Sequence, residues 1–218
     1  MLEKSLGEVC VGKGFRHGPL NDIELIRQNL KDRYGDGLPV LKEFLQNAGD
    51  AGATSVDFIW SQGIASARHE LLRGPALIVL NDGGFSETDR DAIRMMGLSD
   101  KIRQTGSIGK FGIGLKSVFH WCEAFFYLAK APTMPEIEGD ILNPWSGGPG
   151  TSTYHEDWDR FAEPERDEIA THLHHVLPPT RWFCLWIPLR RRAHAGSLTP
   201  IMSTYPGDDP STFRDSLR

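Results

Sequence analysis

The chain has 218 residues, 39% of them hydrophobic and 24% charged, which is the composition of a folded globular protein. It carries 24 Lys and Arg against 29 Asp and Glu, and the resulting formal charge of −5 disfavours a general coating of nucleic acid. No stretch approaches the ~18 apolar residues of a membrane helix, and the N-terminus lacks the apolar core of a secretory signal. We therefore expect a cytoplasmic protein that does not enter a membrane. Its three widely spaced cysteines predict free thiols.

The hydrophobic pattern predicts an alternation of helices and strands. In chain order, the expected elements are helices over 22–34 and 38–51, strands over 55–60 and 75–80, helices over 87–96 and 110–121, a strand over 123–129, a helix over 164–177 and a strand over 181–189. Pro188 is expected at an edge or at a strand end, because proline donates no ladder hydrogen bond.

The domain organisation follows from where this pattern stops. Prolines and glycines in 131–157 predict a long loop. Residues 1–192 are expected to form one domain, with a motif core over 20–130 and a closing helix and strand over 164–190. Residues 193–218 read as a polar tail or the start of a linker, with no visible contribution to the core.

The helix over 38–51 carries a polar stripe. Glu43, Asn47 and Asp50 are spaced so that all three project from one side of the helix. Such a stripe can be a solvated face. It can also present a carboxylate and an amide to a ligand.

The apolar run over 75–80 leads directly into Asn81, Asp82 and two glycines. A strand of this kind is buried on both faces, and the ligands of open α/β sheets usually bind where such strands end. The alternative is a simple turn, for which this composition is also favourable.

A third polar segment, over 106–117, contains four glycines before a run compatible with a helix. Glycines let backbone N–H groups approach an anion, and a helix start favours phosphate. This is not a Walker A loop, because Phe111 follows Gly109 and Lys110 where Ser or Thr is needed. Ser117 also occupies the position that a dinucleotide fingerprint gives to Gly or Ala.

In this order the three segments resemble the N, G1 and G2 boxes of the GHKL ATPases. The stretches RYGDGLPVLKEFLQNAGDAGATSV, LNDGGFSETD and GKFGIGLKSVFH are similar to the sacsin-like branch, which is related to the ninety-kilodalton heat-shock chaperones. The resemblance covers residues 20–130 well. It implies the Bergerat fold, an α+β two-layer sandwich of the α/β class whose mixed, mostly antiparallel sheet is covered on one face by helices.

The resemblance also implies roles for the polar stripe. Glu43 corresponds to the general base that orients the attacking water, Asn47 to the Mg²⁺ ligand, and Asp50 to a residue lining the nucleotide pocket. One carboxylate and one amide suit this chemistry, because phosphoanhydride hydrolysis needs a positioned water and neutralised phosphate charge.

Adenine recognition in the family uses an acid of the G1 box. Here the turn is one residue shorter than Asp-x-Gly-x-Gly and the acid is displaced, so Asp82 is the first choice and Asn81 the second, with Gly84 beside them. Where relatives have a Thr near the adenine, this chain has Phe183, which leaves the choice of nucleobase open.

Contacts to the phosphates are implied for a lysine and for the glycine-rich loop. Lys101 matches a family lysine within a predicted nucleotide-dependent lid over 95–108. The expected backbone donors are those of Gly109, Lys110, Phe111, Gly112, Ile113 and Gly114.

The implied activity is Mg²⁺-dependent ATP binding and slow ATP hydrolysis that acts as a conformational switch for an effector in chaperone-like or defence-like machinery. Expected partners are ATP and ADP, an attached or separate effector, and a second copy of the domain in a nucleotide-dependent dimer. A non-hydrolysing nucleotide sensor and an interaction scaffold remain as alternatives.

Two further features carry little weight. His172, His174 and His175 are spread around their helix by their spacing, which disfavours a metal site. The basic run 190–192 is typical of a solvated strand end.

Overall fold

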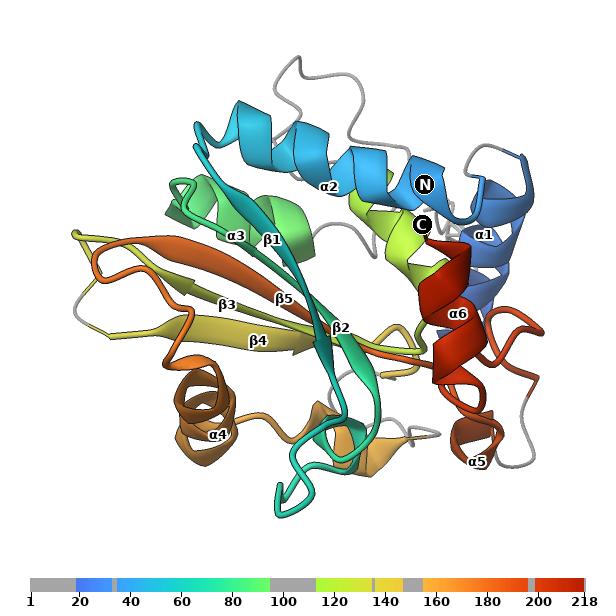
Figure 1. The fold of residues 1–218 in the computed structure, drawn as a ribbon. Coiled ribbons are helices and arrows are strands. Elements are labelled where there is room, and N and C mark those ends of the chain that lie inside the picture. Colours follow the sequence, from blue (N-terminus) through green and yellow to red (C-terminus); the bar gives the residue numbers. More distant parts are fainter. Residues whose placement is uncertain are drawn as a thin grey trace, which may run out of the picture.

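The computed structural model describes residues 19–32, 35–94, 113–134, 136–146, 155–195 and 199–217. Within these ranges, five strands form one sheet in the order β1-β2-β5-β3-β4, and every pairing is antiparallel (Figure 1). The strands are β1 (Val56–Ser61), β2 (Ala76–Asn81), β3 (Phe125–Lys130), β4 (Glu138–Leu142) and β5 (Trp182–Pro188). Together with the helices, this sheet confirms the predicted α+β sandwich.

One face of the sheet is covered by α1 (Pro19–Asp32), α2 (Leu38–Asp50) and the 3₁₀ helix η4 (Ile113–His120), with α3 (Glu87–Arg94) nearby (Figure 1). The helices form because apolar residues recur every three or four positions, so that Val40, Phe44 and Ala48 make a buried stripe on α2. The ring of Phe44 meets Trp121, just after η4, edge to face at 6.3 Å.

The second face also has helical cover, beyond the single layer expected. It comes from α4 (Glu163–Leu173), from the short helices η1 (Glu70–Leu72) and η5 (Glu156–Asp159), and from α5 (Arg192–Ala195). The imidazole of His172 on α4 contacts Trp186 of β5 with ring centroids 5.5 Å apart, and its Nε2 lies 3.2 Å from Ser61 Oγ. Trp158 and Ile169 are buried on this side as well.

Two segments differ from the predicted elements. The predicted loop over 131–157 contains β4, an edge strand that forms because it pairs with β3. The described part of the predicted helix over 110–121 is the 3₁₀ helix η4. Pro188 was expected at a sheet edge or at a strand end, and it is the last residue of β5.

Residues 199–217 belong to the fold, which corrects the expectation of a tail without core contacts. Ile201 is 2% exposed. This segment ends in α6 (Pro210–Ser216), whose Phe213 contacts the rings of Trp60 and Trp121 at 6.3 and 5.3 Å. The apolar residues of the segment were too widely spaced in sequence to reveal this packing.

Cys122 and Cys184 are buried free thiols, as predicted, and Cys10 lies outside the described residues. Across the described ranges, no helix combines the length and apolar character needed to cross a membrane.

Candidate functional site

The helix α2 carries the first part of the candidate site. Its end is set by Gly52, whose φ of 69° is costly for other residues. Glu43 and Asn47 lie one turn apart beside the buried stripe and are both half-buried, whereas Asp50 is exposed.

No hydrogen bond or ion pair joins the side chain of Glu43 or Asn47 to any residue that the structure describes. Polar side chains that lose part of their hydration normally find a protein partner. This carboxylate and this amide are therefore available to a ligand, to water or to a metal ion.

The turn after β2 docks on the C-terminal end of α2. The N–H of Gly84 donates to the carbonyl oxygen of Ala51 at 3.0 Å, and the N–H of Gly83 donates to Asn81 Oδ1 at 2.9 Å. A Cβ on Gly83 would lie 2.7 Å from Asn81 Oδ1 and 2.9 Å from the Cβ of Ala51, so only glycine fits. The fold thus brings together the first two of the three polar segments.

The carboxylate of Asp82 is engaged by the loop that follows α2. It accepts hydrogen bonds from the hydroxyl of Thr54 and from the N–H groups of Thr54 and Ser55, the latter two at 2.7 and 2.9 Å. These donors, with the Thr54 hydroxyl foremost, hold the pKa of the Asp82 carboxyl well below its usual range. The contacts give Asp82 a structural role that was not predicted, although a Thr-Ser pair after a helix stop is a recognisable signal.

Asn81 is 6% exposed and pairs in register with Phe183 of β5. Its side chain therefore shares a sheet face with Phe183, since residues opposite each other in an antiparallel pair project to the same side. Because Oδ1 accepts from Gly83, the amide nitrogen is the remaining group, and it makes no hydrogen bond within the described ranges.

An aromatic cluster borders Asn81. Phe85 stacks on Phe183 with ring centroids 5.3 Å apart and planes inclined by 18°, and it lies 5.6 Å from the ring of Tyr127. Phe183 was expected here from the sequence but Phe85 was not, because its only signal is its place after the glycines of the turn. The apolar surface next to Asn81 is thus covered by an aromatic side chain.

The third polar segment is only partly described. Ile113 and Gly114 are the first residues of η4, which packs against α2. The predicted lid over 95–108 lies outside the described residues. So do the remaining predicted phosphate contacts, Lys101, Gly109, Lys110, Phe111 and Gly112.

Besides stacking on Phe183, Phe85 lines a cavity of about 600 Å³. The cavity is also lined by Glu87, Met134, Glu138 and Arg166. No residue of α2 lines it, so it is separate from the Glu43 and Asn47 pair. Among the described residues, no group of three His, Cys, Asp or Glu side chains could hold a metal ion.

Comparison with known proteins supports the sacsin-like part of the resemblance. A family model described as "Sacsin domain" matches residues 22–133. Over 109 residues the chain is 39% identical to the Homo sapiens protein named Sacsin, and the match covers 45% of this chain and 2% of that protein. The chain thus spans only a small part of this relative. Since the family model covers about half of the chain, including α2 and the turn after β2, this chain belongs to the sacsin domain family.

Proposed function

We propose that this sacsin domain binds ATP with Mg²⁺ and hydrolyses it slowly, so that its nucleotide state acts as a conformational switch. The observation that carries the proposal is the pair formed by Glu43 and Asn47, half-buried, one helical turn apart and without a partner among the described residues. The docking of the turn after β2 on the end of α2 supports it further.

The donor chemistry of the pair fits the proposed ligands. Mg²⁺ favours hard oxygen ligands and usually takes only one or two from the protein, the rest coming from phosphates and water. The amide oxygen of Asn47 suits that role. Bound Mg²⁺ would supply charge neutralisation at the phosphates. Glu43 would hold a water molecule in line and accept its proton, which is the task of a general base.

The start of η4 also suits a phosphate ligand. Backbone N–H groups at a helix start have no partner within the helix and favour anions. Those of Ile113 and Gly114 would donate to phosphate oxygens, with η4 held against α2 by packing.

A second candidate is a nucleotide sensor or scaffold that does not hydrolyse ATP. The stack of Phe85 on Phe183 favours the scaffold in particular, because these rings cover the apolar surface beside Asn81 where a base would lie. Under either candidate, the effector that reads the switch is an attached or separate protein, and the family resemblance implies chaperone-like or defence-like machinery.

Calorimetric titration with ATP, ADP and GTP, with and without Mg²⁺, tests the proposal. We expect saturable ATP binding that Mg²⁺ strengthens, and we expect Asn47→Ala to abolish the effect of Mg²⁺. The variant Gln46→Ala, on the exposed side of the same helix, is the matched control. Absence of binding by the wild-type chain would contradict both candidates that use a nucleotide.

A further inference from the structure

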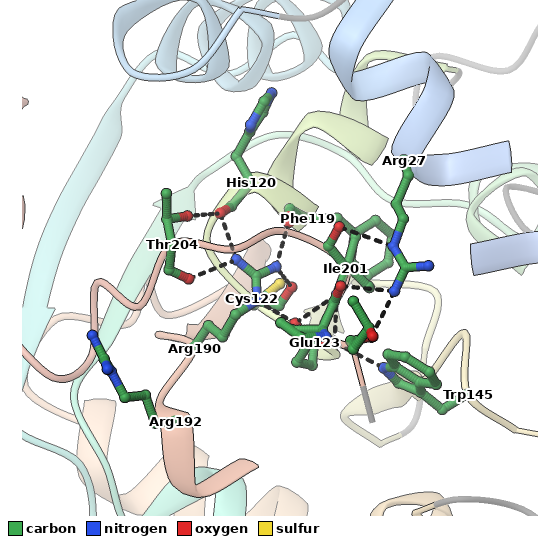
Figure 2. A network of polar contacts seen from close by, with 12 residues as sticks. Arg27, Phe119, His120, Cys122, Glu123, Trp145, Arg190, Arg192, Ile201 and Thr204 are labelled. Atoms are coloured by element: carbon green, nitrogen blue, oxygen red, sulfur yellow. Dashed lines mark hydrogen bonds and ion pairs between the residues drawn. The ribbon is translucent and has the colours of Figure 1, made fainter. Parts of the chain in front are cut away.

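Arg190 is fully buried at the end of β5, although it belongs to a basic run that the sequence predicts to be solvated. Its guanidinium forms an ion pair with Glu123, which is 3% exposed. It also donates to the backbone carbonyl oxygens of Phe119, His120 and Cys122 at 2.6, 2.8 and 2.6 Å (Figure 2).

These carbonyl groups lie at the C-terminal end of η4 and in the turn after it. The last carbonyls of a helix lack partners within the helix, and a cation placed there is stabilising. Arg190 therefore caps the same helix that begins with Ile113 and Gly114. Its five fixed N–H donors are well matched to a converging set of carbonyl oxygens.

The same cluster binds the C-terminal segment, residues 199–207. Both carboxylate oxygens of Glu123 accept from the N–H of Ile201, at 3.1 and 3.2 Å. Arg190 donates to the carbonyl oxygen of Thr204 at 3.2 Å, and the Thr204 hydroxyl donates to that of His120 at 3.3 Å (Figure 2).

Two further contacts hold this C-terminal segment in place. Arg27 of α1 donates to the carbonyl oxygens of Thr199, Pro200 and Ile201, at 2.6, 2.7 and 3.2 Å. At the other end of the segment, the N–H of Gly207 donates to the carbonyl oxygen of Arg190 at 2.9 Å. The segment is thus fixed to α1, to η4 and to the end of β5.

We infer that Arg190 and Glu123 position η4, and that the C-terminal segment sets the geometry of the η4 start. If the domain has the proposed function, an effector that displaces residues 199–207 would loosen η4 and weaken ATP binding at Ile113 and Gly114. Because linkage is reciprocal, bound nucleotide would in turn stabilise the attachment of the C-terminal segment.

Amide hydrogen exchange without nucleotide tests this positioning role. Arg27→Gln removes the guanidinium that donates to residues 199–201 but leaves Arg190, Glu43 and Asn47 intact. We expect it to accelerate exchange across η4 by about fivefold or more, with no change in β2 and β5. Arg27→Lys retains a cationic donor, so its rate of exchange across η4 should lie between those of Arg27→Gln and the wild type.

Arg192→Gln is the matched control. Arg192 lies over the ring of Tyr205 in this C-terminal segment at 5.0 Å and pairs at 3.4 Å with Asp208, the residue directly after that segment, but within the described ranges no hydrogen bond or ion pair joins Arg192 to η4. We expect wild-type exchange across η4 in this variant. Arg190→Lys probes the cap directly and should loosen η4 more than Arg27→Gln, but if it fails to fold, the Arg27 variants still decide.

The inference is overturned if Arg27→Gln accelerates exchange only in residues 199–207, or if Arg192→Gln loosens η4 equally. A titration of the same proteins with Mg²⁺-ATP adds a second readout. The factor by which Arg27→Gln weakens ATP binding should be close to the factor by which it accelerates amide exchange across η4. If the wild-type chain does not bind ATP, the proposed function is wrong. The exchange result then still decides whether Arg190, Glu123 and the C-terminal segment position η4.

Discussion

The indole ring of Trp158 stacks face to face on the imidazole of His155, with ring centroids 3.7 Å apart and planes inclined by 5°. Trp158 is 1% exposed, and His194 meets it edge to face at 6.0 Å. The backbone of Trp158 is bound by a third imidazole: Nε2 of His69 donates to the carbonyl oxygen of Trp158 at 3.2 Å. Nδ1 of His69 accepts from the N–H of Leu71. Three imidazoles thus contact one buried tryptophan on the second face of the sheet, two of them at its indole ring and one at its backbone carbonyl.

This cluster predicts that the domain loses stability in mild acid. Burial lowers the pKa of His69 and His155 and lowers that of His194 to about 4, and the nearby Glu70 opposes this effect at each of them. The unfolded chain takes up protons below about pH 6.5, whereas the folded chain resists them. Stability is therefore complete above this pH and falls as the pH approaches 4. A tenfold difference in proton affinity between the folded and unfolded chains changes the free energy of unfolding by about 1.4 kcal/mol.

Urea unfolding between about pH 7 and about pH 5, followed by tryptophan fluorescence, measures this loss. His194→Gln should flatten the dependence on pH, because it removes the imidazole whose pKa is lowered to about 4. His175→Gln, exposed beyond α4, is the control and should keep the wild-type slope. Equal slopes for the wild type and His194→Gln would show that His194 is not buried as described.

Gly83→Ala is expected to destabilise the fold, since the added Cβ would overlap Asn81 Oδ1 and the Cβ of Ala51. Overpacking of this kind costs about 1–3 kcal/mol. The matched control is Gly84→Ala, where the nearest atom to an added Cβ is the carbonyl oxygen of Ala51 at 3.8 Å. Thermal unfolding of both variants checks the prediction, and equal melting temperatures would contradict it.

Glu43→Ala should separate binding from turnover if Glu43 orients water. ATP affinity should stay close to that of the wild type, while hydrolysis should fall by ~100-fold or more. Calorimetry and phosphate release on the same samples provide the two readouts. An equal loss of both would remove the role of general base from Glu43.

The sandwich could be predicted because its strongest signals are local. The buried run of β2 and the stripe of Val40, Phe44 and Ala48 on α2 read directly from hydrophobic periodicity. The strand β4 could not, because its sequence, EGDIL, contains Gly139 and two acids and becomes a strand only through pairing with β3.

For the candidate site, the sequence indicated positions on an element but not the contacts between elements. Spacing on one helix identifies Glu43 and Asn47, but the partners of Asp82 come from a loop 27 and 28 residues away. The burial of Arg190 is likewise decided by residues distant in sequence, with Glu123 67 positions away. Within a run of three arginines, no local pattern distinguishes the buried one.

The choice between Asn81 and Asp82 as the group that reads the nucleobase leads to a last prediction. Gly83 fixes Oδ1 of Asn81 as an acceptor, which leaves the amide nitrogen as a donor. A donor cannot pair with the exocyclic amine of adenine, so we expect the wild type to prefer ATP over GTP only weakly.

Asn81→Asp keeps the bond to Gly83 and replaces the donor by an acceptor that suits this amine. A buried hydrogen bond of this kind contributes about 1–3 kcal/mol, so the ratio of ATP to GTP affinity should rise by about tenfold. Asp82→Asn is the control, because its contacts are with Thr54 and Ser55, and it should leave the ratio unchanged. If Asp82→Asn alters the ratio and Asn81→Asp does not, Asp82 reads the base and its contacts with the loop must give way when nucleotide binds.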